Sequence, residues 1–454
     1  MKAPRFVIAG TNSGCGKTTI TSALISAIKK RGLKVQPFKI GPDYIDTMFH
    51  SFIAECDGRN IDSFLFNDET LKYVFSKNCK KSDIAICEGV MGMYDGIGRT
   101  STASTADVSK IIKAPIIMVV NAKGMSVSIV PIIKGFLDFD KNINVKGIIL
   151  NNVKSKMQYN FLRSIIKDNI NIEVLGYFQE NENVKLGNRH LGLVTAGEIE
   201  RLEEKMDILS EMAEETINID RIIEIANDTQ ELKVKDILPE ELKYKFNGMK
   251  IGIAYDFAFN FYYRDNIDLL NYLGIETVFF SPIKDEKIPD DVHMLYIGGG
   301  YPELFAVELT NNFSMRNSIK EFAENGGYIY AECGGLMYMS EKIKTFDGNE
   351  YSMTGVLEGS CKMSDKLQHF GYITVKNKET NKYINAHEFH YSVEEIKNDT
   401  VFEVLKTRGS KTTTWESGYK YKNVIASYPH IHFYSNIDFL VEFLEKAYKE
   451  VNNA

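Results

Sequence analysis

The chain of 454 residues lacks the features that would indicate a membrane, secreted or nucleic-acid-wrapping protein. No apolar run reaches the roughly 18 residues that a membrane-spanning helix needs. The first ten residues lead directly into strand-like sequence, without the apolar region and cleavage site of a signal peptide. There is no basic block, and 54 Lys and Arg against 61 Asp and Glu give a net charge of −7, which is unfavourable for nucleic acid binding. We therefore expect a cytoplasmic protein with neither a membrane nor nucleic acid as its partner.

Cysteine is also scarce, and no two of the six cysteines have the C-x-x-C spacing of a zinc or redox site. In a chain of this length they do not indicate a disulfide framework either. Most are expected to be small buried apolar side chains, with Cys333 as the exception. In contrast, 44% hydrophobic and 25% charged residues are ordinary for a globular protein and sufficient for large cores.

The first 230 residues alternate between short β-branched runs and longer amphipathic stretches. Near-continuous apolar strands that alternate with helices are typical of a parallel sheet covered on both faces. The expected strands are residues 5–10, 34–40, 83–88, 115–121, 145–151 and 172–177, and helices are expected at 17–31, 103–112 and 126–136.

From about residue 198 to 245 the sequence is rich in Glu and Lys, which favours one terminal helix followed by a connector. The alternation then restarts, with strands expected at 250–255, 276–281, 293–298, 328–332 and 424–428 and helices near 265–273 and 314–325. The sequence thus predicts an α/β protein of two tandem domains, residues 1–230 and 248–454, joined by a connector at 231–247.

The first expected strand runs into residues 10–19, GTNSGCGKTT, and then into a helix. Small residues let backbone N–H groups reach phosphate oxygens, and a helix N-terminus adds positive potential. We expect Gly14, Gly16, Lys17, Thr18 and Thr19 to bind a nucleoside triphosphate, with the Thr18 hydroxyl on Mg²⁺. The strict pattern has Gly at position 11, whereas this chain has Thr11, and its leading Gly10 comes one residue early.

Polar residues follow three further strands, at the edge of the sheet where ligands bind in such folds. Lys39 ends the second strand and can bridge a nucleotide phosphate and an acidic substrate. Asp43, Asp46 and Glu88 offer the oxygen ligands that Mg²⁺ prefers. Asn151 can contact an adenine edge. The Gly-rich loop after Glu88 is suited to covering a substrate.

The second half contains the arrangement expected of a cysteine nucleophile. The strand 328–332 turns at Cys333 into a short helix, which is the geometry of a nucleophile elbow, and we expect the helix N-terminus to lower the pKa of the thiol. A base is required, and His430 and His432 are the candidates. Backbone N–H groups of Gly299, Gly300 and Gly334 are candidates for an oxyanion hole.

Several motifs together resemble the ATP- and glutamine-dependent amidases of corrin biosynthesis, the cobyrinate a,c-diamide synthase family. They follow one another along nearly the whole chain: GTNSGCGKTT, KIGPDYID, EGVMGMYDG, RHLGL, FNFYYRDN, FFSP, GGGYPE, AECGGLMY, HEFHYS and SYPHIHF. The resemblance implies amidation of the a and c carboxylates of cobyrinic acid, with ATP, Mg²⁺ and L-glutamine. A homodimer is an open alternative to a monomer.

The first half is also similar to dethiobiotin synthetase, whose phosphate loop has the same one-residue offset. That similarity implies an acyl phosphate intermediate, an essential Lys39, and a metal shell of Thr18, Asp46 and Glu88. For the macrocycle, Asp43, Tyr44 and Asp95 are the expected contacts.

The second half resembles class I glutamine amidotransferases, with two departures. Ala331 replaces the usual Gly two residues before the nucleophile, and His432 stands where a carboxylate usually follows the catalytic His. The resemblance therefore implies a Cys333–His430 dyad, with His430 chosen from its Tyr-x-His context and His432 as the alternative. It leaves open which group orients the imidazole.

Three rival functions remain open at this stage. The nickel-sirohydrochlorin a,c-diamide synthase of methanogens shares the architecture and is the nearest enzyme. Cobyric acid synthase acts on other carboxylates of the ring. A ParA/MinD-like switch would have a signature lysine where this chain has Asn12, and it would leave the second half unexplained.

Overall fold

The computed structural model describes residues 2–181, 184, 188–189, 192–193 and 202–451. The chain divides into two compact units, Met1–Ile237 and Leu238–Ala454. The division falls inside the stretch 231–247 expected to be a connector. No helix in these described stretches combines the length and apolar character that a bilayer crossing needs.

The first unit contains a seven-stranded, fully parallel sheet in the order β3-β2-β4-β1-β5-β6-β7. Its strands are β1 (Arg5–Gly10), β2 (Val35–Ile40), β3 (Arg59–Ile61), β4 (Ile84–Glu88), β5 (Ile116–Asn121), β6 (Val145–Val153) and β7 (Glu173–Gln179). Strands β1, β2 and β4 are buried at every position, as expected of a sheet covered on both faces. The edge strand β3, with three residues, is too short to give a periodic signal and was not predicted.

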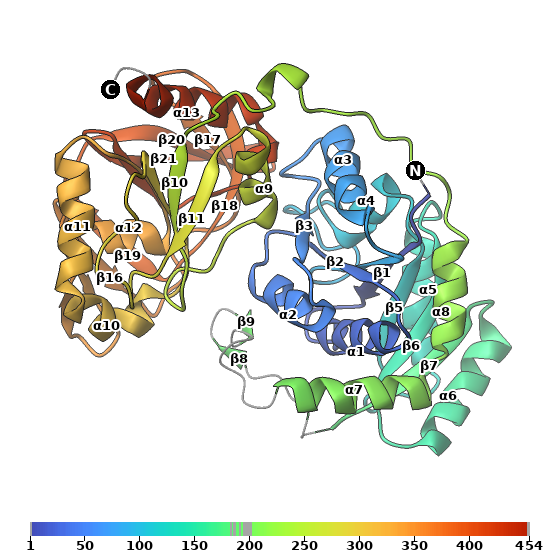
Figure 1. Ribbon diagram of the computed structural model, residues 1–454. Coiled ribbons are helices and arrows are strands. Elements are labelled where there is room, and N and C mark those ends of the chain that lie inside the picture. Colours follow the sequence, from blue (N-terminus) through green and yellow to red (C-terminus); the bar gives the residue numbers. More distant parts are fainter. Residues whose placement is uncertain (1, 182–183, 185–187, 190–191, 194–201, 452–454) are drawn as a thin grey trace. The chain divides into compact units, whose positions relative to one another are not determined.

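Eight helices in the described part of this unit connect and cover the strands (Figure 1). They are α1 (Lys17–Lys30), α2 (Ile45–Ala54), α3 (Asp68–Cys79), α4 (Thr105–Ile111), α5 (Ile129–Phe139), α6 (Lys156–Asn169), α7 (Leu202–Thr216) and α8 (Ile219–Asn227). The prediction of one terminal helix was wrong, because the Asn218 side chain accepts a hydrogen bond from Arg221 N and starts a second helix there. Residues 198–201 lie outside the described residues.

The RHLGL motif is described in part. Residues Asn188–Arg189 (β8) and Gly192–Leu193 (β9) pair as a short antiparallel ladder, while residues 190–191 lie outside the described residues.

The second unit contains a ten-stranded mixed sheet in the order β11-β10-β12-β13-β22-β21-β20-β17-β18-β23. Its parallel part is β10 (Lys250–Ala254), β11 (Glu276–Phe280), β12 (Met294–Ile297), β13 (Tyr328–Glu332) and β22 (Val424–Ser427), all expected from the sequence. The antiparallel part is β17 (Phe370–Asn377), β18 (Tyr383–Phe389), β20 (Thr400–Arg408), β21 (Lys411–Tyr421) and β23 (His430–Ile431). The sequence did not predict this part, because strands such as the largely exposed β21 carry no apolar run.

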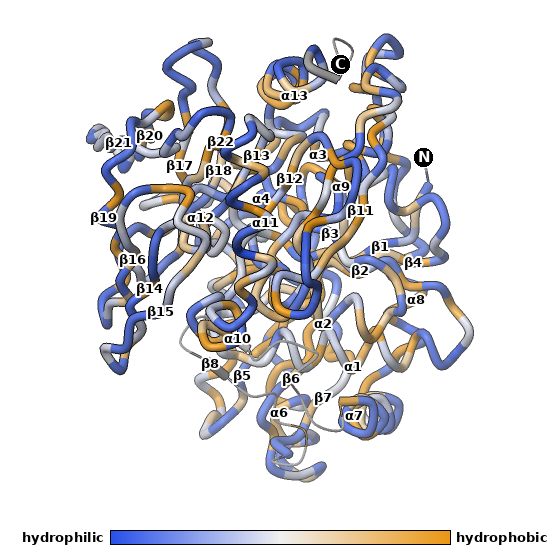
Figure 2. Tube along the Cα trace, turned by 60° about the vertical axis from the view of Figure 1, so that its left-hand side comes forward, coloured by the Kyte–Doolittle hydropathy of each residue, from blue (hydrophilic) through white to orange (hydrophobic). Residues whose placement is uncertain are grey.

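A second, four-stranded sheet has the order β15-β14-β16-β19, with β14 (Lys342–Lys344), β15 (Glu350–Ser352), β16 (Gly359–Met363) and β19 (Ser392–Ile396). The helices of this unit are α9 (Arg264–Tyr272), α10 (Ala306–Asn311), α11 (Phe313–Glu324), α12 (Gly334–Met339) and α13 (Ile437–Val451), with short 3₁₀ turns at η3 (Glu240–Leu242), η4 (Pro302–Phe305) and η5 (Phe433–Ser435). In Figure 2 the hydropathy colours show how apolar and polar residues are distributed along these elements.

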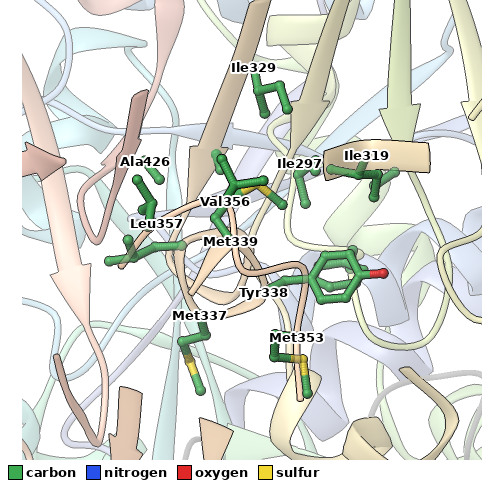
Figure 3. Close-up of a cluster of buried hydrophobic side chains, with 14 of the residues drawn as sticks. Ile297, Ile319, Ile329, Met337, Tyr338, Met339, Met353, Val356, Leu357 and Ala426 are labelled. Carbon is green, nitrogen blue, oxygen red and sulfur yellow. The ribbon is translucent and has the colours of Figure 1, made fainter. Parts of the chain in front are cut away.

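A large apolar cluster lies around α12 (Figure 3). It joins Ile297 of β12, Ile329 of β13 and Ala426 of β22 to Met337, Tyr338 and Met339 of α12 itself, and to Val356 and Leu357 of the following loop. All six residues of α12 are buried. Because interiors are close-packed, this cluster fixes α12, and with it the turn at Cys333, which belongs to the same cluster.

Candidate active sites

The loop between β1 and α1 has the backbone of a phosphate-binding loop. Gly14 and Gly16 have φ angles of 75° and 99°, in the left-handed region that favours glycine. Gly10 is restricted by space instead, because a Cβ there would lie 2.3 Å from Cys15 Sγ. Thr11 is not among the residues with positive φ, so the absence of glycine at this position leaves the loop unstrained.

Most of the residues predicted for the nucleotide and for Mg²⁺ line one cavity of about 650 Å³. Its lining includes Gly14, Gly16, Lys17, Thr18, Thr19, Lys39, Asp43, Asp46, Glu88 and Asn151. They come from the ends of β1, β2, β4 and β6, the edge at which parallel sheets bind ligands. The tertiary structure thus gathers residues that are up to 137 positions apart (Gly14 to Asn151).

Lys39 and Glu88 form the centre of this cavity's charge pattern. Lys39 Nζ lies 2.8 Å from Glu88 Oε1 and also contacts the Asp46 carboxylate, and Thr18 Oγ1 donates a 2.7 Å hydrogen bond to Glu88 Oε1. Burial opposes the charge on Lys39, but the Asp46 and Glu88 carboxylates outweigh it and raise the pKa of Lys39. Lys39 is therefore a permanently charged cation at this edge of the sheet.

The two carboxylates beside Lys39 differ in their ionisation. Burial raises the pKa of Asp46, assisted by the nearby charge of Asp43. Burial acts in the same direction on Glu88, but Lys39 and His50 outweigh it and lower the pKa of Glu88. Glu88 is thus the carboxylate that stays ionised over the whole physiological range.

His50 is a site residue that the sequence analysis missed. His50 Nε2 lies 2.7 Å from Glu88 Oε2, and both side chains are buried. His50 follows Asp46 by four residues on α2, so the two share one face of the helix. The sequence already assigned Asp46 to the site, so a histidine four residues later on the same helix is the signal that could have identified His50.

The described residues contain no group of three or more His, Cys, Asp or Glu side chains placed to hold a metal ion by themselves. Mg²⁺ keeps water and phosphate oxygens among its ligands and typically uses one or two carboxylates. Thr18, Asp46 and Glu88 fit that donor set, because the Thr18 hydroxyl contacts Glu88, and Glu88 and Asp46 both contact Lys39.

Three further residues predicted from the sequence, Asn151, Tyr44 and Asp95, make contacts of their own. The Asn151 side-chain NH₂ donates a 2.8 Å hydrogen bond to Cys15 O, so this amide holds the phosphate loop. Tyr44 is buried and Asp95 Oδ2 accepts a 2.8 Å hydrogen bond from Gly92 N within its own loop. The cavity lining includes neither Tyr44 nor Asp95, so their contact with a macrocycle stays a prediction.

In the second unit, Cys333 has the strained backbone of a nucleophile elbow. Its φ and ψ are 48° and −101°, at the point where β13 ends and α12 begins. Cys333 N donates a 2.7 Å hydrogen bond to Ser427 O on β22, and Cys333 O accepts one from Met337 N. The turn is therefore held from the sheet on one side and from α12 on the other.

The expectation of a lowered thiol pKa was wrong. Burial raises the pKa of the Cys333 thiol above its usual value, and the carboxylate of Glu303 adds to the effect. A hydrogen bond from the Gly334 backbone acts in the opposite direction but is outweighed. The physical reason is that a helix of six residues at a buried position does not compensate for the cost of desolvating a thiolate. A base must therefore remove the thiol proton.

The Gly-rich loop after β12 contacts both the elbow and the imidazole of His430. A Cβ on Gly299 would lie 2.4 Å from His430 Cε1, and a Cβ on Gly334 would lie 3.1 Å from Gly300 N. Gly300 itself has φ 153°, and a Cβ there would lie 2.0 Å from Ala258 O. All three positions thus leave no room for a side chain, and the Gly300 N–H group lies close to Gly334, the residue that follows the nucleophile.

His430 and His432 are both buried but face different neighbours. His430 pairs with His387 across β18 and β23, with ring centroids 4.9 Å apart, and burial lowers the pKa of His430 to about 3. The His432 ring packs on the Tyr263 ring with centroids 4.6 Å apart, and His432 Nδ1 accepts a hydrogen bond from Tyr434 N. Because His430 borders the Gly-rich loop while His432 caps η5, the geometry favours His430 as the base.

The remaining cysteines agree with the sequence expectation. All six are free, and Cys15, Cys79, Cys87 and Cys361 are buried, while Cys56 is half-buried. The HEFHYS motif lies next to the second site, because His387 stacks on His430 and His390 stacks on Tyr428 with ring centroids 3.7 Å apart.

Comparison with known proteins identifies both units. Residues 6–194 match the model of the CobQ/CobB/MinD/ParA nucleotide binding domain, and residues 250–437 match that of the CobB/CobQ-like glutamine amidotransferase domain. A P-loop nucleotide-binding unit followed by a glutamine amidotransferase unit defines a glutamine-dependent amidating ligase.

Full-length relatives narrow this class. The chain is 44% identical to cobyrinate a,c-diamide synthase of Clostridium tetani, over 97% of this chain and 99% of the relative. It is 40% identical to the enzyme of the same name from Caldanaerobacter subterraneus, over 97% and 98% of the two chains. With the enzyme of that name from Thermoplasma volcanium the identity is 42%, over 98% of each. The chain belongs to the cobyrinate a,c-diamide synthase family of cobalamin biosynthesis.

Proposed function

We propose that this protein amidates the a and c carboxylates of cobyrinic acid, with ATP to activate each carboxylate and glutamine as the ammonia source. The observation that carries the proposal is the 40–44% identity, over nearly the whole chain, to relatives named for this reaction. The gathering of a phosphate loop, Lys39 and Glu88 in one cavity supports it from the chemistry of the residues.

In the first unit, Gly14, Gly16, Lys17, Thr18 and Thr19 hold the triphosphate. A carboxylate oxygen of the macrocycle attacks the γ-phosphorus, the bond to the bridging oxygen breaks, ADP leaves and an acyl phosphate forms. Lys17 and Lys39 stabilise the negative charge that accumulates on the transferring phosphoryl group. Mg²⁺, when bound by Thr18, Asp46 and Glu88, neutralises phosphate charge.

In the second unit, the Cys333 sulfur attacks the side-chain amide carbon of glutamine. His430 accepts the thiol proton and passes it to the leaving nitrogen, so the C–N bond breaks, ammonia departs and a thioester remains. Water then hydrolyses the thioester to glutamate. Backbone N–H groups of Gly334 and of Gly299 or Gly300 stabilise the oxyanion. The lowered pKa of His430, caused by burial, keeps its imidazole neutral before the proton is transferred.

Ammonia then attacks the acyl phosphate carbon, phosphate leaves, and the amide forms with loss of one proton. Ammonia must react as the neutral molecule, because the ammonium ion has no lone pair. Both half-reactions in one chain give ammonia a high effective concentration at the second step.

Product analysis by mass spectrometry tests the substrate. With ATP and glutamine, we expect cobyrinate to gain two amides and nickel-sirohydrochlorin to remain unchanged. Preferential amidation of nickel-sirohydrochlorin would overturn the corrinoid assignment, and ATP hydrolysis stimulated by DNA or vesicles instead of by either acid would support a ParA/MinD-like switch.

Two variants test the division of labour. Cys333→Ser should abolish glutamine-driven amidation and retain amidation with added ammonia. Lys17→Ala should abolish both. If ammonia fails to rescue a folded Cys333→Ser protein, or if Lys17→Ala keeps ammonia-driven amidation, the proposed roles of these residues are wrong.

A further inference from the structure

Glu332, the residue immediately before the nucleophile, is a buried carboxylate next to His430. Its side chain is 1% exposed, and Glu332 Oε2 lies 4.0 Å from His430 Nδ1. Position 432 has no carboxylate, and Glu332 brings one close to His430 from the end of β13.

Hydrogen bonds hold this carboxylate in place. Glu332 Oε1 accepts from Tyr330 Oη at 2.9 Å and from Ile431 N at 3.2 Å. Glu332 Oε2 accepts from Tyr296 Oη at 3.1 Å. The Ile431 bond comes from the residue next to His430, so Glu332 connects the end of β13 directly to β23. Three donors around a buried carboxylate fix its position relative to the imidazole.

We propose that Glu332 is the positioning carboxylate of the glutaminase site, taking the part of the acid that orients the catalytic imidazole in related triads. This inference rests on the proposed role of His430 as base. Glu332 Oε2 lies 4.0 Å from Nδ1, too far for a hydrogen bond, so Glu332 acts through its charge. The charge favours the tautomer of His430 that carries its proton on Nδ1, which leaves Nε2 unprotonated and able to accept the proton of Cys333. When the Cys333 proton moves to Nε2, the positive imidazolium forms next to the Glu332 carboxylate, which stabilises it. Glu332 neither accepts nor donates a proton in this step.

The ionisation of Glu332 gives the arrangement a measurable signature. Burial raises its pKa to about 7, although the hydrogen bonds from Tyr330, Ile431 and Tyr296 act in the opposite direction. Glutaminase activity should therefore increase as the pH rises through about 7. Other titratable groups that face Glu332, His430 or Cys333 include Tyr262, Tyr296, Glu303, Tyr330, His387, Glu388, His390 and Tyr428.

The test is Glu332→Gln, which keeps the shape and the acceptor oxygen but removes the charge. We expect its glutaminase kcat to fall on the order of 100-fold, with an unchanged KM for glutamine and without the rise in activity near pH 7. Tyr330→Phe is the matched control, because it deletes one hydrogen bond to Oε1 and leaves the carboxylate opposite His430. It should stay within about threefold of the wild-type kcat.

Ammonia-driven amidation by each variant reports that the protein is folded. If Glu332→Gln misfolds, Glu332→Asp keeps the charge and should retain the rise in activity near pH 7. Equal losses in Glu332→Gln and Tyr330→Phe, or a Glu332→Gln enzyme within twofold of the wild type, would overturn the inference. Cys333→Ser distinguishes failure of this inference from failure of the proposed function. If only the inference about Glu332 is wrong, Cys333→Ser still loses glutaminase activity. If the proposed function is wrong, Cys333→Ser retains it.

Discussion

His50 Nε2 lies 2.7 Å from Glu88 Oε2 in the nucleotide-binding unit, and both side chains are buried. The contact places Glu88 between two basic groups, since Lys39 Nζ lies 2.8 Å from its other oxygen. The carboxylate assigned to Mg²⁺ is therefore positioned from α2 as well as from β2.

Removal of this contact should impair the first unit. We expect His50→Ala to lower kcat of ammonia-driven amidation about tenfold, because Glu88 loses a buried partner that fixes its second oxygen. The measurement is the steady-state rate with saturating ammonia and varied Mg²⁺. His293→Ala is the control, since His293 accepts a hydrogen bond from Lys250 N in the other unit. Equal rates for His50→Ala and the wild type would remove His50 from the site.

The phosphate loop should not tolerate a side chain at Gly16. A Cβ there would lie 1.9 Å from Asn151 Nδ2, and the φ of 99° is strained for any other residue. We expect Gly16→Ala to weaken ATP binding by at least about tenfold, measured by calorimetry. Gly98→Ala is the matched control, because Gly98 has φ 65° with open space around its Cβ position. ATP affinity lost equally in both variants would mean that general backbone strain, and not the loop, is responsible.

The two histidines after β22 can be separated by substitution with Asn. His430→Asn should reduce glutaminase kcat by about 1,000-fold, because the general base is lost. His432→Asn should reduce it far less, since the Asn oxygen can accept the hydrogen bond that His432 Nδ1 accepts from Tyr434 N. Glutamate release without ATP is the measurement. The reverse order of effects would assign the base to His432.

Glu332 should also make stability depend on pH. Its pKa is raised by burial from 4.5 to about 7, so between these values the folded protein holds a proton that the unfolded chain releases. The free energy of unfolding therefore falls as the pH rises through this window, by up to about 3 kcal/mol. The free energy of unfolding of Glu332→Gln does not fall in this way, because the Gln side chain does not titrate. Urea unfolding should therefore show that the stability of the variant relative to the wild type is greater at pH 8 than at pH 4. A difference that is the same at both pH values would contradict this.

Much of the fold was predictable because the signals are local. Strands β1 and β10 each consist of a basic residue followed by apolar residues and glycine, and the Gly-rich loop after β1 has its glycines where the backbone needs them. The antiparallel strands β17 to β21 were missed, since half-exposed strands with Thr, Lys and Glu are not distinguished from loops by composition.

The sequence alone determined which chemical groups are present: a phosphate loop, a cysteine at a strand-to-helix turn, and histidines downstream. Tertiary structure decided their neighbours and hence their ionisation. Burial raises the pKa of Cys333, where local helix geometry predicted a lower value, and strand pairing brings Glu332 to within 4.0 Å of His430, 98 positions further along the chain. Both effects depend on distance and burial in space, which no local pattern of residues encodes.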